Sequence, residues 1–256
     1  MEIQATLSAT IAWAPSDCPH DPIDDAHGAF APFSGLARRL LPYAAKGDDG
    51  AHDATHAERV WRHARTIAQT EGGDGEILLA AAILHDCVTY EKTSPLRRRA
   101  STDAAARARF VLEGEDWPAK RIDEVAHAVQ AHSRSARVAP RSLEAKILQD
   151  ADRIDSLGVI GVARCLYIAG RIGGQLYHRA DPFAERRPRD ETRYALDQLD
   201  ALAATGTASF HTAAGACIAK RAMRRLRGVI EALHADIETD AGPPDTARSI
   251  ELAARD

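Results

Sequence analysis

The sequence predicts an all-α fold, arranged as a single helical bundle. Hydrophobic residues make up 45% of its 256 residues and aromatic residues only 5%, with alanine very frequent. This balance favours helix over sheet, because strands are enriched in β-branched and aromatic side chains. Apolar residues also recur at steps of three and four, as they do on one face of a helix, and we find no convincing strand pattern. A chain of this length can bury a substantial core.

Charge and cysteine content exclude several classes of protein. The net charge of -4 argues against a basic nucleic-acid binder. No run approaches the roughly 18 apolar residues of a membrane helix, and no basic region precedes an apolar stretch at the N-terminus, so we expect neither a membrane span nor a secretory signal. The four cysteines are scattered without a CxxC pair, which is typical of a reduced, cytoplasmic protein.

The first residues differ in composition from the rest of the chain. Residues 1–34 contain five acidic residues, no lysine or arginine, and four of the twelve prolines. We therefore expect a poorly ordered acidic extension over 1–34, a helical bundle over 35–238 and a polar tail over 239–256.

The first helices are predicted in order from apolar spacing and end signals. Helical texture begins near Gly35, and a second helix over 53–73 can be capped by Asp53. The segment "EILLAAAILHD" (76–86) is apolar nearly all round, which indicates a buried helix. A further helix starts with capping residues at Ser101.

The remaining helices follow the same logic. A helix over 118–133 has proline in its first turn, where the missing N–H is harmless. The segment 142–170 reads as one long helical stretch, in which Gly158 and Gly161 form a flat patch for a neighbouring helix. A loop rich in charge and proline (173–191) precedes two more helical segments, 192–206 and 212–237.

His85 and Asp86 are the most informative polar pair in the chain. They follow directly on the buried helix, where an unpaired carboxylate would be costly. A metal ion would pair that charge, and imidazole nitrogen with carboxylate oxygen suits Mn²⁺, Fe²⁺, Ni²⁺ or Zn²⁺. Two further candidate ligands lie on other helices: His56 in a first turn and Asp152 within "QDADRID".

The segments around these residues together resemble the HD-domain metal-dependent phosphohydrolases, in particular their small single-domain bacterial members. The resemblance covers roughly residues 36–194 and rests on four segments: "HDATHAERVWRHA", "AAILHDCVTYEKTSPLRRRAS", "HAVQAHS" and "EAKILQDADRIDSLGVIGVAR". It implies a single HD-domain helical bundle. Two segments depart from the family pattern: "DAT" before His56 lacks a bulky aromatic residue, and "TAAGAC" lacks a basic residue after its glycine.

The resemblance implies a metal site made by four residues, listed here: His56, His85, Asp86 and Asp152. For the last carboxylate, Asp150 and Asp155 compete with Asp152, which matches the family position just before a basic residue. Asp155 lies one helical turn after Asp152 and would hold a neighbouring side chain or the substrate. Asp53 is expected either to cap its helix or to orient a ligand histidine from behind.

Phosphoryl transfer also needs positive and proton-donating groups around the metal. Lys92 would contact phosphate as a point charge and Arg97 as a bidentate donor. His127 and His132 would face the phosphates or protonate the leaving group, with Asp86 also counted as catalytic, and Arg134 would assist.

The resulting expectation is an enzyme, a divalent-metal-dependent hydrolase acting on nucleotides. The favoured reaction converts (deoxy)nucleoside triphosphates to monophosphate and diphosphate by metal-bound hydroxide. A nucleotide monophosphatase or a cyclic-nucleotide phosphodiesterase stays open, and more distantly a metal-dependent oxygenase or lyase, or a non-catalytic metal-stabilised module. Mn²⁺ is the expected ion, with Fe²⁺, Ni²⁺, Co²⁺, Zn²⁺ and Mg²⁺ as alternatives. The expected partner is a small nucleotide, not a membrane or nucleic acid, and a homodimer is left open.

Overall fold

The computed structural model describes residues 28–44, 53–90, 94–133 and 136–240, and within them the chain is helical with no strand. This confirms the predicted all-α fold. The elements, in chain order, are α2 (Ser34–Leu40), η1 (Leu41–Tyr43), α3 (Ala54–Glu71), α4 (Gly75–Leu84), η2 (Pro95–Arg99), α5 (Ala100–Gly114), α6 (Ala119–His132), α7 (Leu143–Asp155), α8 (Gly158–Arg171), α9 (Ala195–Ala204) and α10 (Ala213–Asp240).

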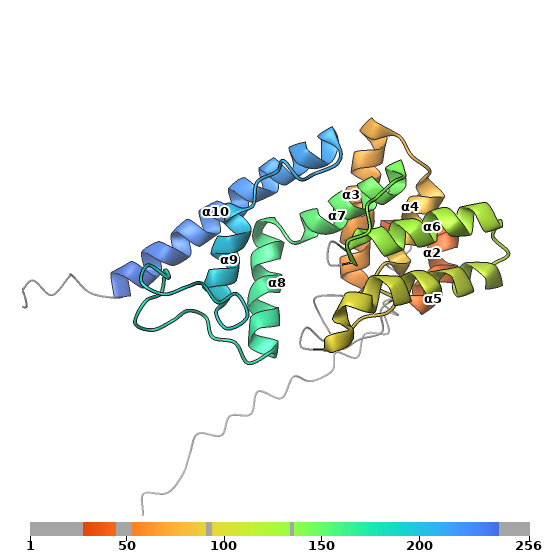
Figure 1. Cartoon of the computed structure of the whole chain (residues 1–256). Helices are drawn as coiled ribbons and strands as arrows, with labels where there is room; N and C mark the ends of the chain where they lie inside the picture. The colour runs from red at the N-terminus through yellow and green to blue at the C-terminus, as the bar shows by residue number, and fades with distance from the viewer. Residues whose placement is uncertain (1–27, 45–52, 91–93, 134–135, 241–256) are drawn as a thin grey trace, which may run out of the picture.

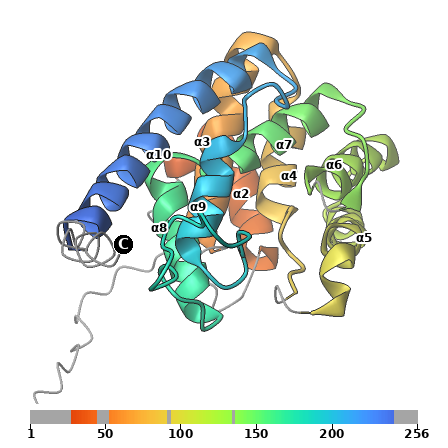
Figure 2. The same cartoon turned by 60° about the vertical axis from the view of Figure 1, so that its left-hand side comes forward.

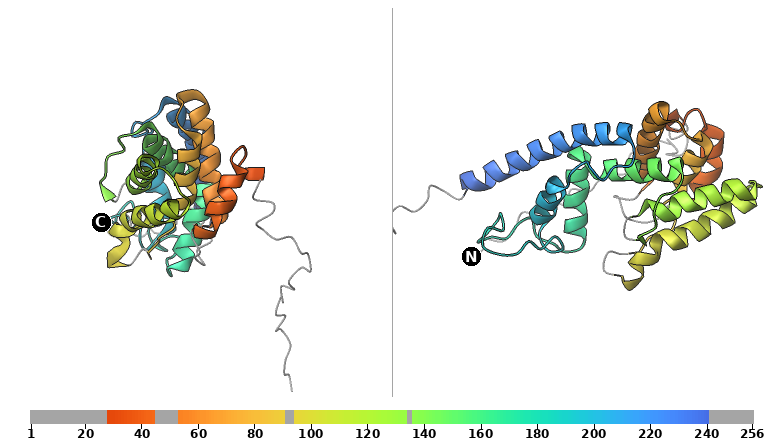
Figure 3. Two further views of the ribbon diagram at one scale, coloured as in Figure 1. Left: turned by 90° about the vertical axis from the view of Figure 1, so that its right-hand side faces the viewer. Right: turned by 45° about the horizontal axis from the view of Figure 1, so that its top comes forward.

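The helices fall into two connected groups (Figure 1). Helices α3, α4, α6 and α7 pack against one another, and α5 pairs with α6 as a hairpin on the outer side. Helix α10 contacts α3 and α7 near its start and then runs along α8 and α9, as Figures 2 and 3 show from other sides. No helix in the described part of the chain is long and apolar enough to cross a membrane.

Helix α4 is the centre of the core. Every residue from Ile77 to Leu84 is buried, as its unbroken apolar sequence predicted. Asp74 caps its first turn by accepting hydrogen bonds from the backbone N–H groups of Glu76 and Ile77. His85 follows as the C-terminal capping residue, so the first polar side chain after the apolar run stands at the end of a buried helix.

Helix α3 presents His56 from its first turn. Val60, Ala64 and Ile67 are buried along its inner face. Asp53 is the N-cap: its Oδ1 accepts a hydrogen bond from the His56 backbone N–H at 3.0 Å. The cap fixes where the helix begins and therefore the direction in which His56 leaves it.

The segment 142–170 is two helices, so the prediction of one long helical stretch was wrong. The chain turns between Asp155 and Gly158, which has φ +69°, a conformation that glycine adopts without strain. A Cβ at Gly161 would lie 2.1 Å from the carbonyl oxygen of Ser156, so only glycine fits this turn. Ala222 of α10 lies against Gly158, with its Cβ 3.8 Å from the position a Cβ there would take.

The ends of other elements also differ from the predicted ones. Helix α5 begins at Ala100, and Ser101 is a buried residue of its first turn instead of its cap. Packing starts before residue 34: Phe30 is buried, and the Phe33 ring lies edge-on against Trp61 at 6.0 Å. The rest of the expected extension (1–27) and most of the expected tail (241–256) lie outside the described residues.

Candidate metal centre

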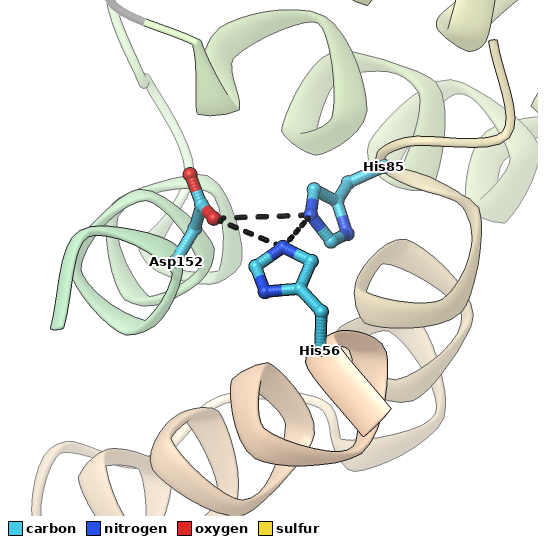
Figure 4. A group of neighbouring side chains, drawn as sticks. All are labelled: His56, His85 and Asp152. Carbon is cyan, nitrogen blue, oxygen red and sulfur yellow. Dashed lines mark hydrogen bonds and ion pairs between the residues drawn. The ribbon is translucent and has the colours of Figure 1, made fainter. Parts of the chain in front are cut away.

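Four side chains from three parts of the bundle converge on one point. His56 comes from the start of α3, His85 and Asp86 from the end of α4, and Asp152 from α7. Figure 4 shows His56, His85 and Asp152 turned toward one another. The two imidazoles are buried, whereas the side chains of Asp86 and Asp152 are 21% and 29% exposed. The point of convergence is therefore open to solvent on its carboxylate side.

The converging atoms are close enough to share one ion. The His56 and His85 Nε2 atoms are 3.1 Å apart. Asp152 Oδ1 lies 3.4 Å from His56 Nε2 and 3.8 Å from His85 Nε2. Asp86 Oδ2 lies 3.7 Å and 3.4 Å from the same two nitrogens. An ion with bonds of about 2.1 Å holds ligand atoms about 3.0–3.4 Å apart when they are adjacent and up to about 4.2 Å apart when they are opposite, so this set fits a divalent cation.

The second nitrogen of each imidazole fixes its tautomer. His85 Nδ1 lies 2.8 Å from the Ala82 carbonyl oxygen, which can only accept a hydrogen bond. His56 Nδ1 lies 2.8 Å from Asp155 Oδ2, also an acceptor. Both Nδ1 atoms are therefore the donors, and the neutral rings direct bare Nε2 lone pairs at each other. Such a pair is unfavourable without a cation or a proton between the two nitrogens.

The electrostatics of the site match this requirement for positive charge. Burial lowers the pKa of His85, but the Asp86 and Asp152 carboxylates outweigh burial and raise that pKa to about 9. Burial raises the pKa of Asp152, but His56 and His85 outweigh it and bring that pKa to about 2. The site thus holds a proton when no metal is bound, which is what a cation site does.

His132 adds a third buried imidazole beside the first two. Its ring meets that of His85 edge-on at 4.9 Å, and its Nε2 lies 3.6 Å from Asp86 Oδ1. Its Nδ1 donates to the Val129 carbonyl oxygen at 2.7 Å, which leaves Nε2 bare. Burial lowers the pKa of His132, as does the neighbouring His85. Helix α6 ends at His132, within one residue of the predicted end at 133.

The two competing carboxylates of α7 point elsewhere. Asp150 accepts hydrogen bonds from the backbone N–H groups of His211 and Thr212, at 2.9 and 2.8 Å, and from the Thr212 hydroxyl at 2.7 Å. It therefore anchors the start of α10. Asp155 lies behind His56, on its Nδ1 side. Of the three α7 aspartates, Asp152 is the one that faces the Nε2 atoms of the two histidines.

Two of the predicted phosphate contacts, His127 and Arg97, lie within the described residues. His127 Nε2 accepts a hydrogen bond from the Arg141 backbone N–H at 3.0 Å, so it faces the loop between α6 and α7. Burial lowers the pKa of His127. Arg97 lies exposed in η2. Lys92 and Arg134 lie outside the described residues.

Two arginines near the site were missed by the sequence reasoning. Arg59, one turn after His56, and Arg164 of α8 both contact Asp155. Burial raises the pKa of Asp155, but hydrogen bonds from His56 and Arg59 and the charge of Arg164 hold that pKa well below its usual range. The position of Arg59, one helical turn after His56, could have indicated that the two side chains are neighbours. No local sequence pattern relates Arg164 to Arg59 or to His56.

Comparisons with known proteins agree with the fold. Residues 53–157 match the family model of the HD domain, which includes the whole converging group. The chain is 31% identical to the Bacillus subtilis protein YpgQ over 134 residues, a match that spans 51% of this chain and 63% of YpgQ. The aligned part is thus less than two thirds of that relative.

Solved structures have the same fold. A Lactobacillus plantarum protein superposes with a TM-score of 0.60 at 24% identity, covering 84% of this chain and 98% of its own. A Bacillus thuringiensis protein described as an HD-superfamily hydrolase gives 0.55 at 24% identity, with coverages of 83% and 96%. Bacillus subtilis YpgQ, crystallised in complex with ADP, gives 0.54 at 23% identity, with coverages of 79% and 97%.

Proposed function

We propose that this chain, whose residues 53–157 match the family model of the HD domain, is a divalent-metal-dependent phosphohydrolase acting on nucleotides. Its most specific form is hydrolysis of (deoxy)nucleoside triphosphates to monophosphate and diphosphate. One observation carries the proposal: the Nε2 atoms of His56 and His85 are 3.1 Å apart and are faced by two carboxylates. The ADP complex of YpgQ supports a nucleotide as the ligand.

In this proposal His56, His85, Asp86 and Asp152 hold the cation, with Mn²⁺ as the favoured ion. A bound divalent ion would lower the pKa of a coordinated water toward neutrality and offset charge on the phosphoryl group. The partly exposed carboxylate side of the site admits the phosphates.

His132 stands next to the proposed ligand set and has a bare Nε2 for proton transfer or for a phosphate oxygen. Lys92, Arg97, His127 and Arg134 remain proposed phosphate contacts. Within the described residues, Cys87, Cys165 and Cys217 are thiols outside any disulfide, which favours a cytoplasmic location.

The test is a panel of ribo- and deoxynucleotides incubated with Mn²⁺, with Mg²⁺ or with a chelator, followed by separation of products by anion exchange. Release of diphosphate and monophosphate supports the specific form. Release of orthophosphate from monophosphates, or opening of cyclic nucleotides, replaces it with the phosphatase or the phosphodiesterase. The Asp86→Ala variant is expected to lose both metal and turnover. A wild-type protein that turns over no nucleotide under any of these conditions contradicts the proposal.

A further inference from the structure

A buried ion-pair cluster lies behind His56, on the side away from the converging nitrogens. Arg59 of α3 forms a bidentate ion pair with Asp155 of α7: its Nε lies 2.6 Å from Oδ1 and its Nη2 lies 3.1 Å from Oδ2. Arg164 of α8 reaches the same Oδ2 with its Nη1. The Asp155 side chain is 1% exposed, and those of Arg59 and Arg164 are 20% and 14% exposed. Three helices therefore meet at one carboxylate.

The cluster encloses the first turn of α3. Arg59 Nη1 donates to the Thr55 hydroxyl at 2.9 Å, and that hydroxyl donates to Asp53 Oδ1 at 2.7 Å. Asp53 Oδ1 also accepts the His56 backbone N–H, while Asp155 Oδ2 accepts its Nδ1–H. The backbone and the ring of His56 are thus held by one continuous chain of hydrogen bonds.

Stability alone is a poor reason for this arrangement. Replacing a buried ion pair with apolar residues of similar volume is often neutral or stabilising. In the described part of the chain, the buried Arg164 Nε–H has no hydrogen-bond acceptor, which adds a further cost. What the cluster does provide is a carboxylate that cannot rotate and that faces a histidine nitrogen.

We propose that Arg59 and Arg164 are positioning residues of the metal site: they hold Asp155 so that His56 stays protonated on Nδ1 and presents Nε2 to the cation. The inference rests on the proposed function only in taking this site to bind a divalent cation. It assigns a role to Arg59 in the segment "HAERV" and to Arg164 in the segment "GVAR", two residues that the proposed ligand set does not include.

The two arginines differ in geometry, and the difference makes the inference testable. Arg59 uses two nitrogens in a fork that lysine cannot reproduce. Arg164 reaches Asp155 through one nitrogen, which a lysine ammonium can replace. Lysine is therefore expected to rescue position 164 and not position 59.

The experiment measures Mn²⁺ affinity of the full chain by competition with a fluorescent chelator, for the variants Arg59→Gln, Arg59→Lys, Arg164→Gln and Arg164→Lys. The two glutamine variants and Arg59→Lys are expected to bind Mn²⁺ about 10- to 100-fold more weakly, as is usual when a group that orients a metal ligand is lost. Arg164→Lys is expected to stay within a few-fold of wild type. In metal-free protein, ¹⁵N imidazole spectra should show His56 losing its single Nδ1–H tautomer in the same three variants.

Arg109→Gln is the matched control, because Arg109 pairs with Asp123 on the exposed side of the α5–α6 hairpin. It should change neither affinity nor tautomer. The inference is overturned if the glutamine variants keep wild-type Mn²⁺ affinity and a single His56 tautomer, even with lowered stability. If Arg59→Gln does not fold, the two Arg164 variants decide. A wild-type protein that binds Mn²⁺ but hydrolyses no nucleotide refutes the proposed function and leaves this inference to be decided by affinity.

Discussion

Two aspartates of α7, only two positions apart, should separate metal binding from stability. Asp150 accepts hydrogen bonds from two backbone N–H groups and from one hydroxyl at the start of α10. Asp150→Ala leaves the buried N–H and hydroxyl donors of Thr212 unpaired. An unpaired buried donor costs about 1–3 kcal/mol, so the loss of stability for the two is about 2–6 kcal/mol.

Asp152→Ala should have the opposite signature. Asp152 faces the Nε2 atoms of His56 and His85, so in the proposed metal site its loss removes a ligand. At a Mn²⁺ concentration about 100 times the wild-type Kd, bound metal raises the free energy of unfolding by about 2.7 kcal/mol. Loss of a ligand that lowers affinity more than about 100-fold removes most of that gain.

Urea unfolding with Mn²⁺ and with EDTA measures both quantities for each variant. Asp150→Ala should unfold at lower urea in both buffers and keep the full Mn²⁺-dependent gain. Asp152→Ala should keep the higher stability of the two in EDTA and lose the gain. The assignment is refuted if Asp150→Ala loses the Mn²⁺-dependent gain while Asp152→Ala retains it.

Three further predictions follow from local features. In EDTA, raising the pH from 6.5 to 9 should lower the free energy of unfolding by on the order of 3 kcal/mol. The reason is that the pKa of His85 is raised to about 9, so its stabilising proton is lost over that range. A free energy of unfolding, measured with urea, that does not change with pH would contradict this. Gly161→Ala should lower the free energy of unfolding by about 2–4 kcal/mol, because its Cβ would lie 2.1 Å from a carbonyl oxygen. The control is Gly170→Ala on the same helix, where a Cβ meets open space. That variant should be neutral or stabilising in thermal unfolding. Iodoacetamide should alkylate Cys87 far more slowly than the exposed Cys217, because burial raises the pKa of Cys87 to about 12; equal rates by mass spectrometry would contradict this.

The features that were predictable from sequence are local ones. The apolar run of α4 predicted a fully buried helix, and the capping residue Asp53 predicted where α3 begins. The His85-Asp86 pair drew attention because it follows that run. The meeting of His56 and Asp152 with this pair was expected only through the family resemblance, since no local pattern relates residues so far apart. That these four bind metal remains a prediction.

The features that escaped prediction depend on contacts between distant segments. The break between α7 and α8 is set by a carbonyl of the turn meeting Gly161, which apolar periodicity does not reveal, whereas the approach of α10 at Gly158 agrees with the predicted flat patch for a neighbouring helix. Asp155 and Asp152 are one turn apart, and only packing against α3 and α8 decides that Asp155 faces the back of His56.

Anomalous diffraction at the manganese edge, from crystals of this protein grown with Mn²⁺, would locate the bound ion among its ligands. We expect one strong peak about 2.2 Å from His56 Nε2 and His85 Nε2, with Asp86 and Asp152 oxygens completing the protein ligands. A peak bound instead by Asp150 or Asp155, or no peak at these histidines at saturating Mn²⁺, would contradict this expectation.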